Sequence, residues 1–254
     1  MKYISVEEGR ELAGLRLVLT AGVPGPWGEA IKSIFAFKAL PFAAVRQEAA
    51  GDNAALLEWT GQDSAPVAVL DDLPPVCHWL DQWMLAERMA PDKPLLPADP
   101  ALAAEAIGVS ALIAGVHGFG WNRRLQLMQP VLAMENPPPG FLHMGRKYGC
   151  TPEATAAATQ RLQAICADLD ARLARQAAAG SDYFVGAQAT AADLYWAAFL
   201  VMIKPLPADL CPMDEGMRAI YSGADEATQG CISERLEQHR DMVYARHIQL
   251  PLDF

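Results

Sequence analysis

A proline-rich segment near residue 95 divides the sequence into two parts with different patterns. The segment, APDKPLLPADP at positions 90–100, carries four prolines and is typical of a linker. Before it, short apolar runs alternate with runs of helical period, whereas beyond it nearly every signal is helical. We therefore predict an α/β domain at residues 1–90, a linker at 91–99 and an all-helical domain at 100–254.

The first part contains three candidate strands, which are LRLVLT (15–20), FAAVRQ (42–47) and APVAVLDD (65–72). A helix separates the first two strands, an irregular stretch separates the second from the third, and a helix at 79–89 follows. This order predicts a crossover between two parallel strands, followed by antiparallel pairing.

The helix after the first strand has a clear start and a clear apolar face. Gly25 suits the N-cap and Pro26 the first helical position. Residues at i, i+4, i+7 and i+8 spacing form one apolar stripe with a polar end; they are Trp27, Ile31, Ile34, Phe35 and Lys38.

Helix-start signals mark the second part. Asp99 and Thr151 are capping residues that each precede a proline. TAAD at 190–193 has the form of a capping box, with Asp193 placed to accept a hydrogen bond from the Thr190 amide. The apolar run LYWAAFLVMI that follows predicts a core helix.

Composition excludes several classes of function. Hydrophobic residues make up 52% of the chain and charged residues 20%, as in globular proteins. The net charge of −10 and the pI of about 4.9 disfavour partners such as nucleic acid and anionic membrane surfaces. The most apolar stretch, AIGVSALIAGVHGFGW, is shorter than a bilayer span and predicts a buried helix. The polar start, MKYISVEEGR, is not that of a signal peptide.

Cysteine and histidine are scattered along the chain. The five cysteines form no C-x-x-C pair, so a disulfide framework is not expected and a reducing cytoplasm fits. We interpret all of them except Cys77 as small buried apolar residues. The five histidines show no H-x-x-x-H spacing, and no metal site is predicted.

Three stretches resemble one known family. They are PWGEAIKSIFAFKALPF (26–42), SAPVAVLDD (64–72) and DYFVGAQATAADLYWAAFL (182–200). They are similar to the first helix, the cis-proline segment and the N-cap signature of the glutathione S-transferase superfamily, and the third is the most specific. The resemblance covers nearly the whole chain. It implies a thioredoxin-like N-terminal domain, an all-α C-terminal domain and a symmetric homodimer.

The resemblance also implies a site. Ala65 and a cis Pro66 would hold the peptide backbone of glutathione, and the helical domain would supply an apolar pocket for an electrophile. Trp121 and Arg124 lie with Arg123 in GFGWNRRLQLM, where the family usually builds that pocket. The arginine pair could receive an acidic substrate or could pair with nearby carboxylates.

The sequence departs from the family at two motifs. Gly25 stands where some classes have a serine or cysteine, and Ala21 stands near the tyrosine position of others. The acidic-Ser pair for the γ-glutamyl group is replaced by DLPPVCHWL, in which Asp72, Cys77 or His78 could substitute.

Two sources of thiolate stabilisation remain near the first helix. One is the hydroxyl of Thr20. The other is the set of backbone amides at the start of the Trp27 helix, those of Gly25, Trp27 and Gly28, since prolines have none. Trp27 could also line the pocket or serve only in packing.

Basic residues offer partners for the carboxylates of glutathione. Arg46 and Lys38 could meet the glycine carboxylate, or they could be solvated surface residues. His78 is either a ligand or a capping residue.

The function that follows is glutathione-dependent transfer or lyase chemistry on a small hydrophobic electrophile. The alternative is a non-catalytic protein of the same fold that binds glutathione or another ligand. A thiol–disulfide reductase is less favoured, because no cysteine stands at the start of the first helix.

Overall fold

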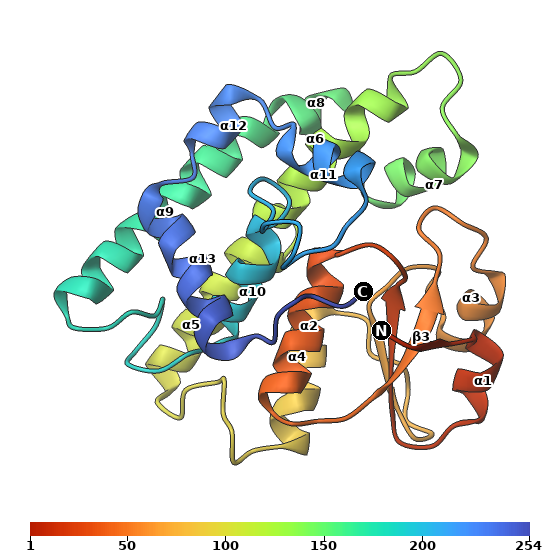
Figure 1. Cartoon of the computed structure of the whole chain (residues 1–254), viewed down its shortest axis with the longest axis horizontal. Helices are drawn as coiled ribbons and strands as arrows, with labels where there is room; N and C mark the ends of the chain where they lie inside the picture. Colours follow the sequence, from red (N-terminus) through yellow and green to blue (C-terminus); the bar gives the residue numbers. More distant parts are fainter.

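The computed structural model describes all 254 residues and shows an α/β part beside a larger helical part (Figure 1). The α/β part holds one four-stranded sheet with strand order β1-β3-β2-β4. Its strands are β1 (Tyr3–Ile4), β2 (Leu15–Thr20), β3 (Ala43–Gln47) and β4 (Val67–Leu70). Its helices are α1 (Val6–Glu11), α2 (Pro26–Phe37), α3 (Ala54–Thr60) and α4 (Trp79–Met89).

Strand pairing confirms the topology predicted from the sequence. β2 pairs with β3 in parallel, with Val18 opposite Val45, and α2 forms the crossover between them. β2 pairs with β4 in the antiparallel sense, with Leu17 opposite Ala68. The thioredoxin-like part and the all-α part are thus both present.

Three short elements were not predicted. β1 has only two residues, which is too short for an alternating pattern, and α1 has six. The stretch interpreted as irregular contains α3, which ends at Gly61 in the left-handed conformation. Its apolar residues are too few for a helical period to stand out.

One apolar core joins the two parts. A cluster of 46 buried residues runs from the inner face of the sheet through α2 into the helical part, where α2 packs against α10 (Ala191–Leu200). Every residue of α10 is buried, which confirms the predicted core helix. The other face of the sheet forms a small cluster of Val18, Val45, Leu56, Val67 and Val69.

The proline-rich segment is fixed to both parts. The Lys38 ammonium is buried, donates to the carbonyls of Ala90 (2.9 Å) and Lys93 (2.7 Å), and lies 3.0 Å from the Glu87 carboxylate. The Leu95 carbonyl accepts from the Ala191 amide (3.2 Å). Lys38 is therefore a structural anchor of this segment rather than an exposed cation.

The helical part begins at α5 and contains nine helices, α10 among them. The others are α5 (Pro100–Ala114), α6 (Phe119–Leu132), α7 (Pro139–Lys147), α8 (Pro152–Ala156), α9 (Ala158–Ala178), α11 (Glu215–Ser222), α12 (Glu226–Gly230) and α13 (Glu234–His247). The predicted caps Asp99 and Thr151 both accept first-turn amides.

Residues 100–132 are long and apolar enough, by length and composition, to cross a membrane as one continuous helix. In the structure, however, the chain turns at Gly115–Gly118, which separates α5 from α6. A Cβ atom at Gly118 would lie 2.9 Å from the Ala111 carbonyl oxygen, so this turn needs a glycine. The segment is therefore two shorter helices that pack within the helical part.

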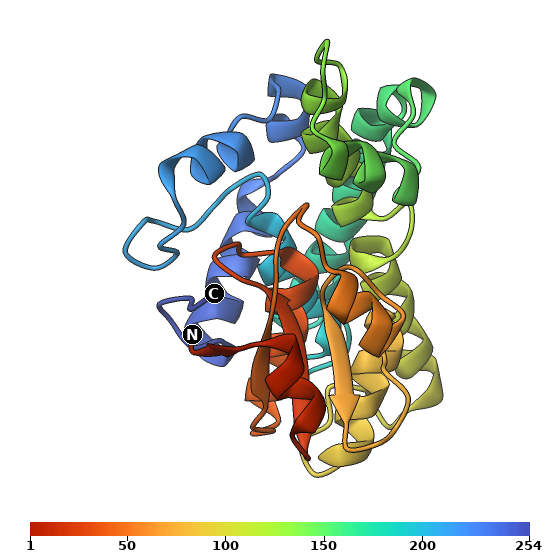
Figure 2. The same cartoon turned by 90° about the vertical axis from the view of Figure 1, so that its right-hand side faces the viewer.

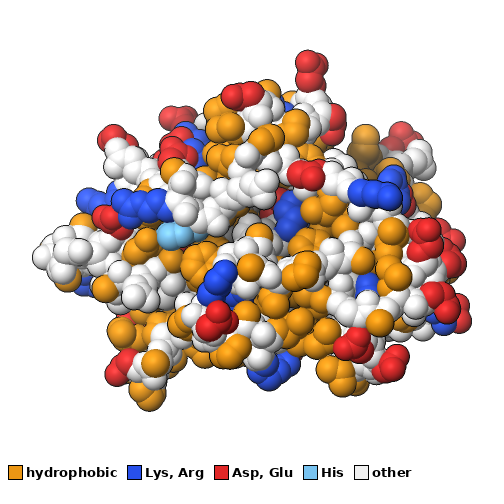
Figure 3. Space-filling model, turned by 60° about the horizontal axis from the view of Figure 1, so that its bottom comes forward, with side chains coloured by type: hydrophobic (Ala, Val, Ile, Leu, Met, Phe, Trp, Pro, Cys, Tyr) orange, Lys and Arg blue, Asp and Glu red, His pale blue; other side chains and the backbone are white.

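The two ends of the chain meet near α2 (Figures 1 and 2). Lys32 on α2 donates to the carbonyl of Asp253 (2.6 Å), and the Met1 amino group pairs with the Asp253 carboxylate. The C-terminal segment thereby ties the helical part to the α/β part. Another face of the molecule carries acidic side chains mainly around its edge, with apolar side chains across its middle (Figure 3).

Candidate functional site

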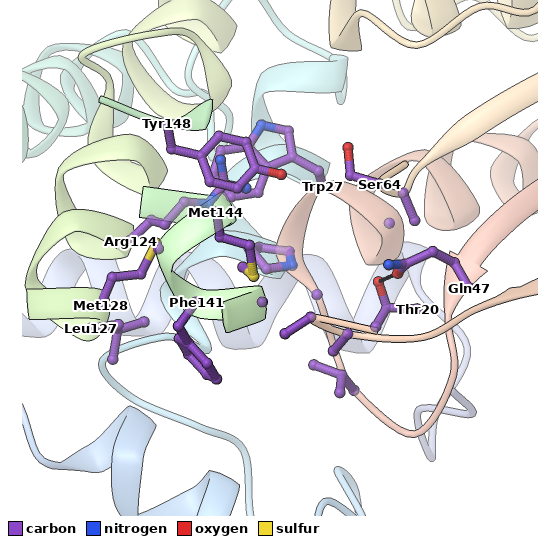
Figure 4. Close-up of a pocket in the computed structure, with 18 of the residues that line it drawn as sticks. Thr20, Trp27, Gln47, Ser64, Arg124, Leu127, Met128, Phe141, Met144 and Tyr148 are labelled. Atoms are coloured by element: carbon purple, nitrogen blue, oxygen red, sulfur yellow. Dashed lines mark hydrogen bonds between the residues drawn. The ribbon is translucent and has the colours of Figure 1, made fainter. Parts of the chain in front are cut away.

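A cavity of about 430 Å³ lies between the two parts, and its two walls differ in character. The wall from the α/β part includes backbone of the β2–α2 turn and carries the polar side chains of Thr20, Gln47, Asn53, Asp63 and Ser64 among apolar ones such as Leu19, Val23 and Trp27. The opposite wall comes from α6, α7 and α11 and is largely apolar (Figure 4). It includes Leu127, Met128, Val131, Phe141, Met144, Met217 and Ile220. The volume suits a small molecule.

The start of α2 presents backbone donors to this cavity. The Gly25 amide is taken by the Val23 carbonyl (2.7 Å), and Pro26 has no N–H. The amides of Trp27 and Gly28 belong to the first turn, which has no upstream helical carbonyl, and no side chain caps this helix. Both residues line the cavity, so their amides are the donors available to a bound anion.

The Thr20 hydroxyl already donates to another residue. It donates to the Gln47 side-chain oxygen at 2.6 Å, and the Gln47 amide group in turn donates to the Glu48 carbonyl, also at 2.6 Å (Figure 4). A hydroxyl has only one hydrogen to donate. In this arrangement Thr20 offers a ligand only acceptor lone pairs, which leaves the α2 amides as the nearest donors.

Ala65 and Ser64 line the cavity beside this turn. The Ala65–Pro66 peptide bond is cis, as the resemblance implied. The buried Gln82 amide donates to the carbonyls of Pro66 (3.0 Å) and Val76 (2.9 Å), which fixes this segment against α4.

Comparisons of the sequence alone find no matching family profile and no matching curated protein. Solved structures do match. A glutathione S-transferase of Methylobacterium radiotolerans, in complex with glutathione sulfonate, has a TM-score of 0.64, with 18% identity over 92% of each chain. One from Methylobacillus flagellatus with glutathione bound has a TM-score of 0.65, with 13% identity over 92% of this chain and 96% of that one. The omega 3C transferase of Trametes versicolor has a TM-score of 0.58, with 12% identity over 98% of this chain and 94% of that one.

The chain has the glutathione S-transferase fold. The fold class predicted from the three motifs is thereby confirmed. At these sequence identities the match shows the fold alone. The chemistry of the cavity between the two parts follows from the residues that line it.

Several residues that the sequence analysis assigned to glutathione binding lie outside the cavity. Arg46 is exposed and pairs with Glu48. Asp72, Cys77 and His78 are exposed near the start of α4, where His78 is the N-cap residue, and none lines the cavity. They are not brought together with Thr20, Gly25, Trp27 and Ala65, which all line it.

The two adjacent arginines of α6 take different environments. Arg123 is buried and donates to the carbonyls of Met202 (2.9 Å) and Tyr221 (3.1 Å), so it joins α6 to the segments around it. Arg124 lines the cavity, with its guanidinium carbon 3.9 Å from the centre of the Trp27 ring. Only Arg124 is available to a ligand.

Aromatic side chains surround Arg124. The Tyr148 ring centre lies 4.1 Å from the guanidinium carbon and the Trp121 ring centre 5.5 Å from it. Trp121 is not in the cavity wall, but its ring contacts that of Tyr148 edge-on, with centroids 5.8 Å apart. Trp121 therefore supports Arg124 through Tyr148.

A polar cluster missed by sequence reasoning closes one side of the cavity. Lys147 and His143 on α7 both contact the Asp63 carboxylate, and Lys147 also donates to the Ser64 hydroxyl (2.8 Å). The hydrogen bond from Lys147, and then that from His143, holds the pKa of Asp63 below its usual value. These partners are 80 or more positions apart in the sequence, so no local motif could have indicated them.

Proposed function

We propose that the protein binds glutathione in this cavity and joins its sulfur atom to a small, largely apolar electrophile, forming a glutathione thioether. The observation that carries this proposal is the contrast between the two walls. The free helix N-terminal amides and the polar side chains on the α/β wall suit a charged tripeptide and its thiolate, and the mainly apolar wall across from them suits the second substrate. The proposal agrees with two solved proteins of this fold that contain glutathione or its sulfonate.

The residues of the β2–α2 turn would supply the thiolate stabilisation. A free thiol has a pKa near 8.5, and the thiolate is the reacting form. The amides of Trp27 and Gly28 at the N-terminus of α2 would favour that anion by roughly 0.3–1 kcal/mol, and by up to about 2 kcal/mol when partly buried. Such stabilisation lowers the pKa of the thiol by about 0.2–0.7 units, and by up to about 1.5 units when the amides are partly buried.

Thermal unfolding with and without glutathione tests the proposal. Glutathione at 100 times its dissociation constant should stabilise the native state by about 2.7 kcal/mol and raise Tm clearly. Free cysteine at the same concentration is the control and should leave Tm unchanged. An unchanged Tm at millimolar glutathione would contradict the proposal.

Conjugation of an aryl halide then separates an enzyme from a binding protein. The non-catalytic alternative is favoured by one observation, namely that no side chain at the β2–α2 turn provides a free donor for the thiol. Binding of glutathione without conjugation of any tested electrophile would favour that alternative.

Replacing Thr20 with valine should leave the pKa of the bound thiol within a few tenths of a unit. The Thr20 hydroxyl donates to Gln47, so the thiolate would depend on the α2 amides instead. If the hydroxyl were the donor, losing a charge-assisted bond of roughly 1.5–3 kcal/mol would raise the thiol pKa by about 1–2 units. Ultraviolet titration of the bound thiolate measures this pKa. Thr60→Val is the matched control, because the Thr60 hydroxyl donates to the Leu56 carbonyl outside the cavity.

We also propose a homodimer located in the cytoplasm. A shallow apolar groove around Leu73, which is 57% exposed, is lined by Leu70, Pro74, Val76, Leu85 and Arg88 and offers a contact surface. Light scattering at micromolar concentration should report twice the chain mass of 27.4 kDa, and a mass near 27.4 kDa would contradict the dimer. The cytoplasmic location is proposed from the spacing of the five cysteines, which are scattered along the sequence and form no C-x-x-C pair.

A further inference from the structure

Arg124 is the one cation in the cavity wall without an acidic partner. The other two cations of the wall, His143 and Lys147, both contact the Asp63 carboxylate, and Glu29 accepts a hydrogen bond from Lys32 (2.7 Å). Arg124 takes part in no salt bridge, because every carboxylate oxygen lies more than 4.0 Å from it. Burial lowers the pKa of Arg124, and an anion beside it would offset that effect.

The guanidinium of Arg124 is held in place by rings rather than by hydrogen bonds. Trp27 and Tyr148 lie close enough for cation–π contact, at 3.9 and 4.1 Å. Trp27 is itself fixed, because its indole N–H donates to the Ala114 carbonyl (2.9 Å) and its ring packs edge-on against Phe199. Aromatic faces do not use up N–H donors in the plane of the guanidinium, so these remain for a ligand.

Donors in a planar fork match a carboxylate. A guanidinium presents two parallel N–H groups to the two oxygens, which gives a strong and directional pair. The pairing is strengthened where the surroundings exclude water, and the neighbours of Arg124 in the wall are Leu127, Met128 and Met144 (Figure 4). Such neighbours suit an apolar body attached to the carboxylate.

Trp27 connects Arg124 to the amides at the start of α2, where the thiolate is proposed to bind. Its backbone amide is one of the donors for the thiolate, and its ring contacts Arg124. Only the Trp27 side chain would therefore separate a carboxylate bound to Arg124 from a thiolate bound at the Trp27 amide. We propose that the second substrate is a compact carboxylate with an apolar body, oriented by Arg124 so that its electrophilic carbon faces the thiolate.

This inference rests on the proposed function, and the reaction is written for an aryl halide. The thiol proton passes to water, and the thiolate sulfur bonds to the ring carbon that carries chlorine. The electron pair of the carbon–chlorine bond then leaves with chloride, which gives a thioether and a chloride ion. Arg124 holds the carboxylate throughout and acts as a specificity-determining residue.

A matched pair of electrophiles tests the proposal with the full chain. The pair is a chlorodinitrobenzoate and the corresponding chlorodinitrobenzamide, which differ only in the charge of one group. With saturating glutathione, Arg124→Met should lower kcat/KM for the benzoate about ten- to hundredfold, as expected for loss of a bidentate charged pair. The same variant should change kcat/KM for the benzamide by less than about threefold.

Two further variants complete the set. Arg124→Lys should recover only part of the loss, because an ammonium lacks the planar fork. Arg175→Met, at an exposed position on α9 outside the cavity, removes the same charge and should change neither substrate. Equal losses for the benzoate and the benzamide in Arg124→Met, or no loss for either, would overturn the proposal.

A binding measurement separates this inference from the proposed function. Dinitrobenzoate, which has no leaving group, should raise Tm of the glutathione-saturated wild type more than dinitrobenzamide does, and Arg124→Met should abolish that difference. If neither electrophile is turned over but this difference is seen, the transferase function fails and the carboxylate site stands. Equal shifts for the two compounds in the wild type refute the site whether or not turnover occurs.

Discussion

Replacing Asp193 with alanine should lower the free energy of unfolding by about 3–5 kcal/mol. The Asp193 carboxylate is completely buried and accepts hydrogen bonds from the Phe184 amide (2.9 Å), the Thr190 amide (2.8 Å) and the Thr190 hydroxyl (2.9 Å). The His239 ring nitrogen Nε2 lies 3.0 Å from it as well. Removing the acceptor leaves the Phe184 and Thr190 amides and the Thr190 hydroxyl buried without this partner, and each orphaned donor costs roughly 1–3 kcal/mol.

Urea unfolding followed by circular dichroism measures this loss. Asp209→Ala is the matched control, since Asp209 is exposed in a turn after α10 and should change the free energy of unfolding by no more than about 0.5 kcal/mol. A loss below about 1 kcal/mol in Asp193→Ala would show that the capping network is dispensable.

The same network explains why much of the fold could be predicted from sequence. Thr190 and Asp193 are three positions apart, so a local motif shows both the start of α10 and its cap. The parallel and antiparallel pairing of β2 followed from the order of strands and one crossover helix. Local pattern and final structure agree at these places because the contacts that decide them are local or follow from chain order.

The candidate site was less predictable, because its polar contacts join distant segments. The pair of Asp63 and Lys147 spans 84 positions, and the pair of Thr20 and Gln47 spans 27. Arg123 and Arg124 show the limit most clearly. Consecutive helical residues lie about 100° apart around the axis, so one neighbour enters the core while the other faces the cavity. The resemblance assigned Arg124 to the pocket, but the residue pattern itself did not show that Arg123 would enter the core while Arg124 faced the cavity.

Gly120→Ala should lower the free energy of unfolding by about 1–3 kcal/mol or more, which is opposite to the usual effect of alanine in a helix. A Cβ atom at Gly120 would lie 2.2 Å from Cε1 of the Phe199 ring and 3.0 Å from the Trp27 ring. Phe199 is completely buried and contacts Trp27 edge-on at 4.7 Å, so neither ring has room to move without repacking. The matched control, Gly108→Ala on α5, meets no atom within 4 Å at an exposed helical position. It should stabilise the protein by about 0.5–1 kcal/mol.

A second substitution identifies the cause of that loss. If the clash with Phe199 is responsible, Phe199→Leu should cost less in the Gly120→Ala background than in the wild type, with a coupling of about 0.5–3 kcal/mol between the two sites. Strictly additive losses in urea unfolding would show that the ring is not the obstacle.

Gly120→Ala should also impair the cavity, because the displaced Phe199 ring presses on Trp27, whose ring supports Arg124. The benzoate selectivity expected from Arg124 should therefore fall in this variant and return with Phe199→Leu, while Gly108→Ala should leave it unchanged.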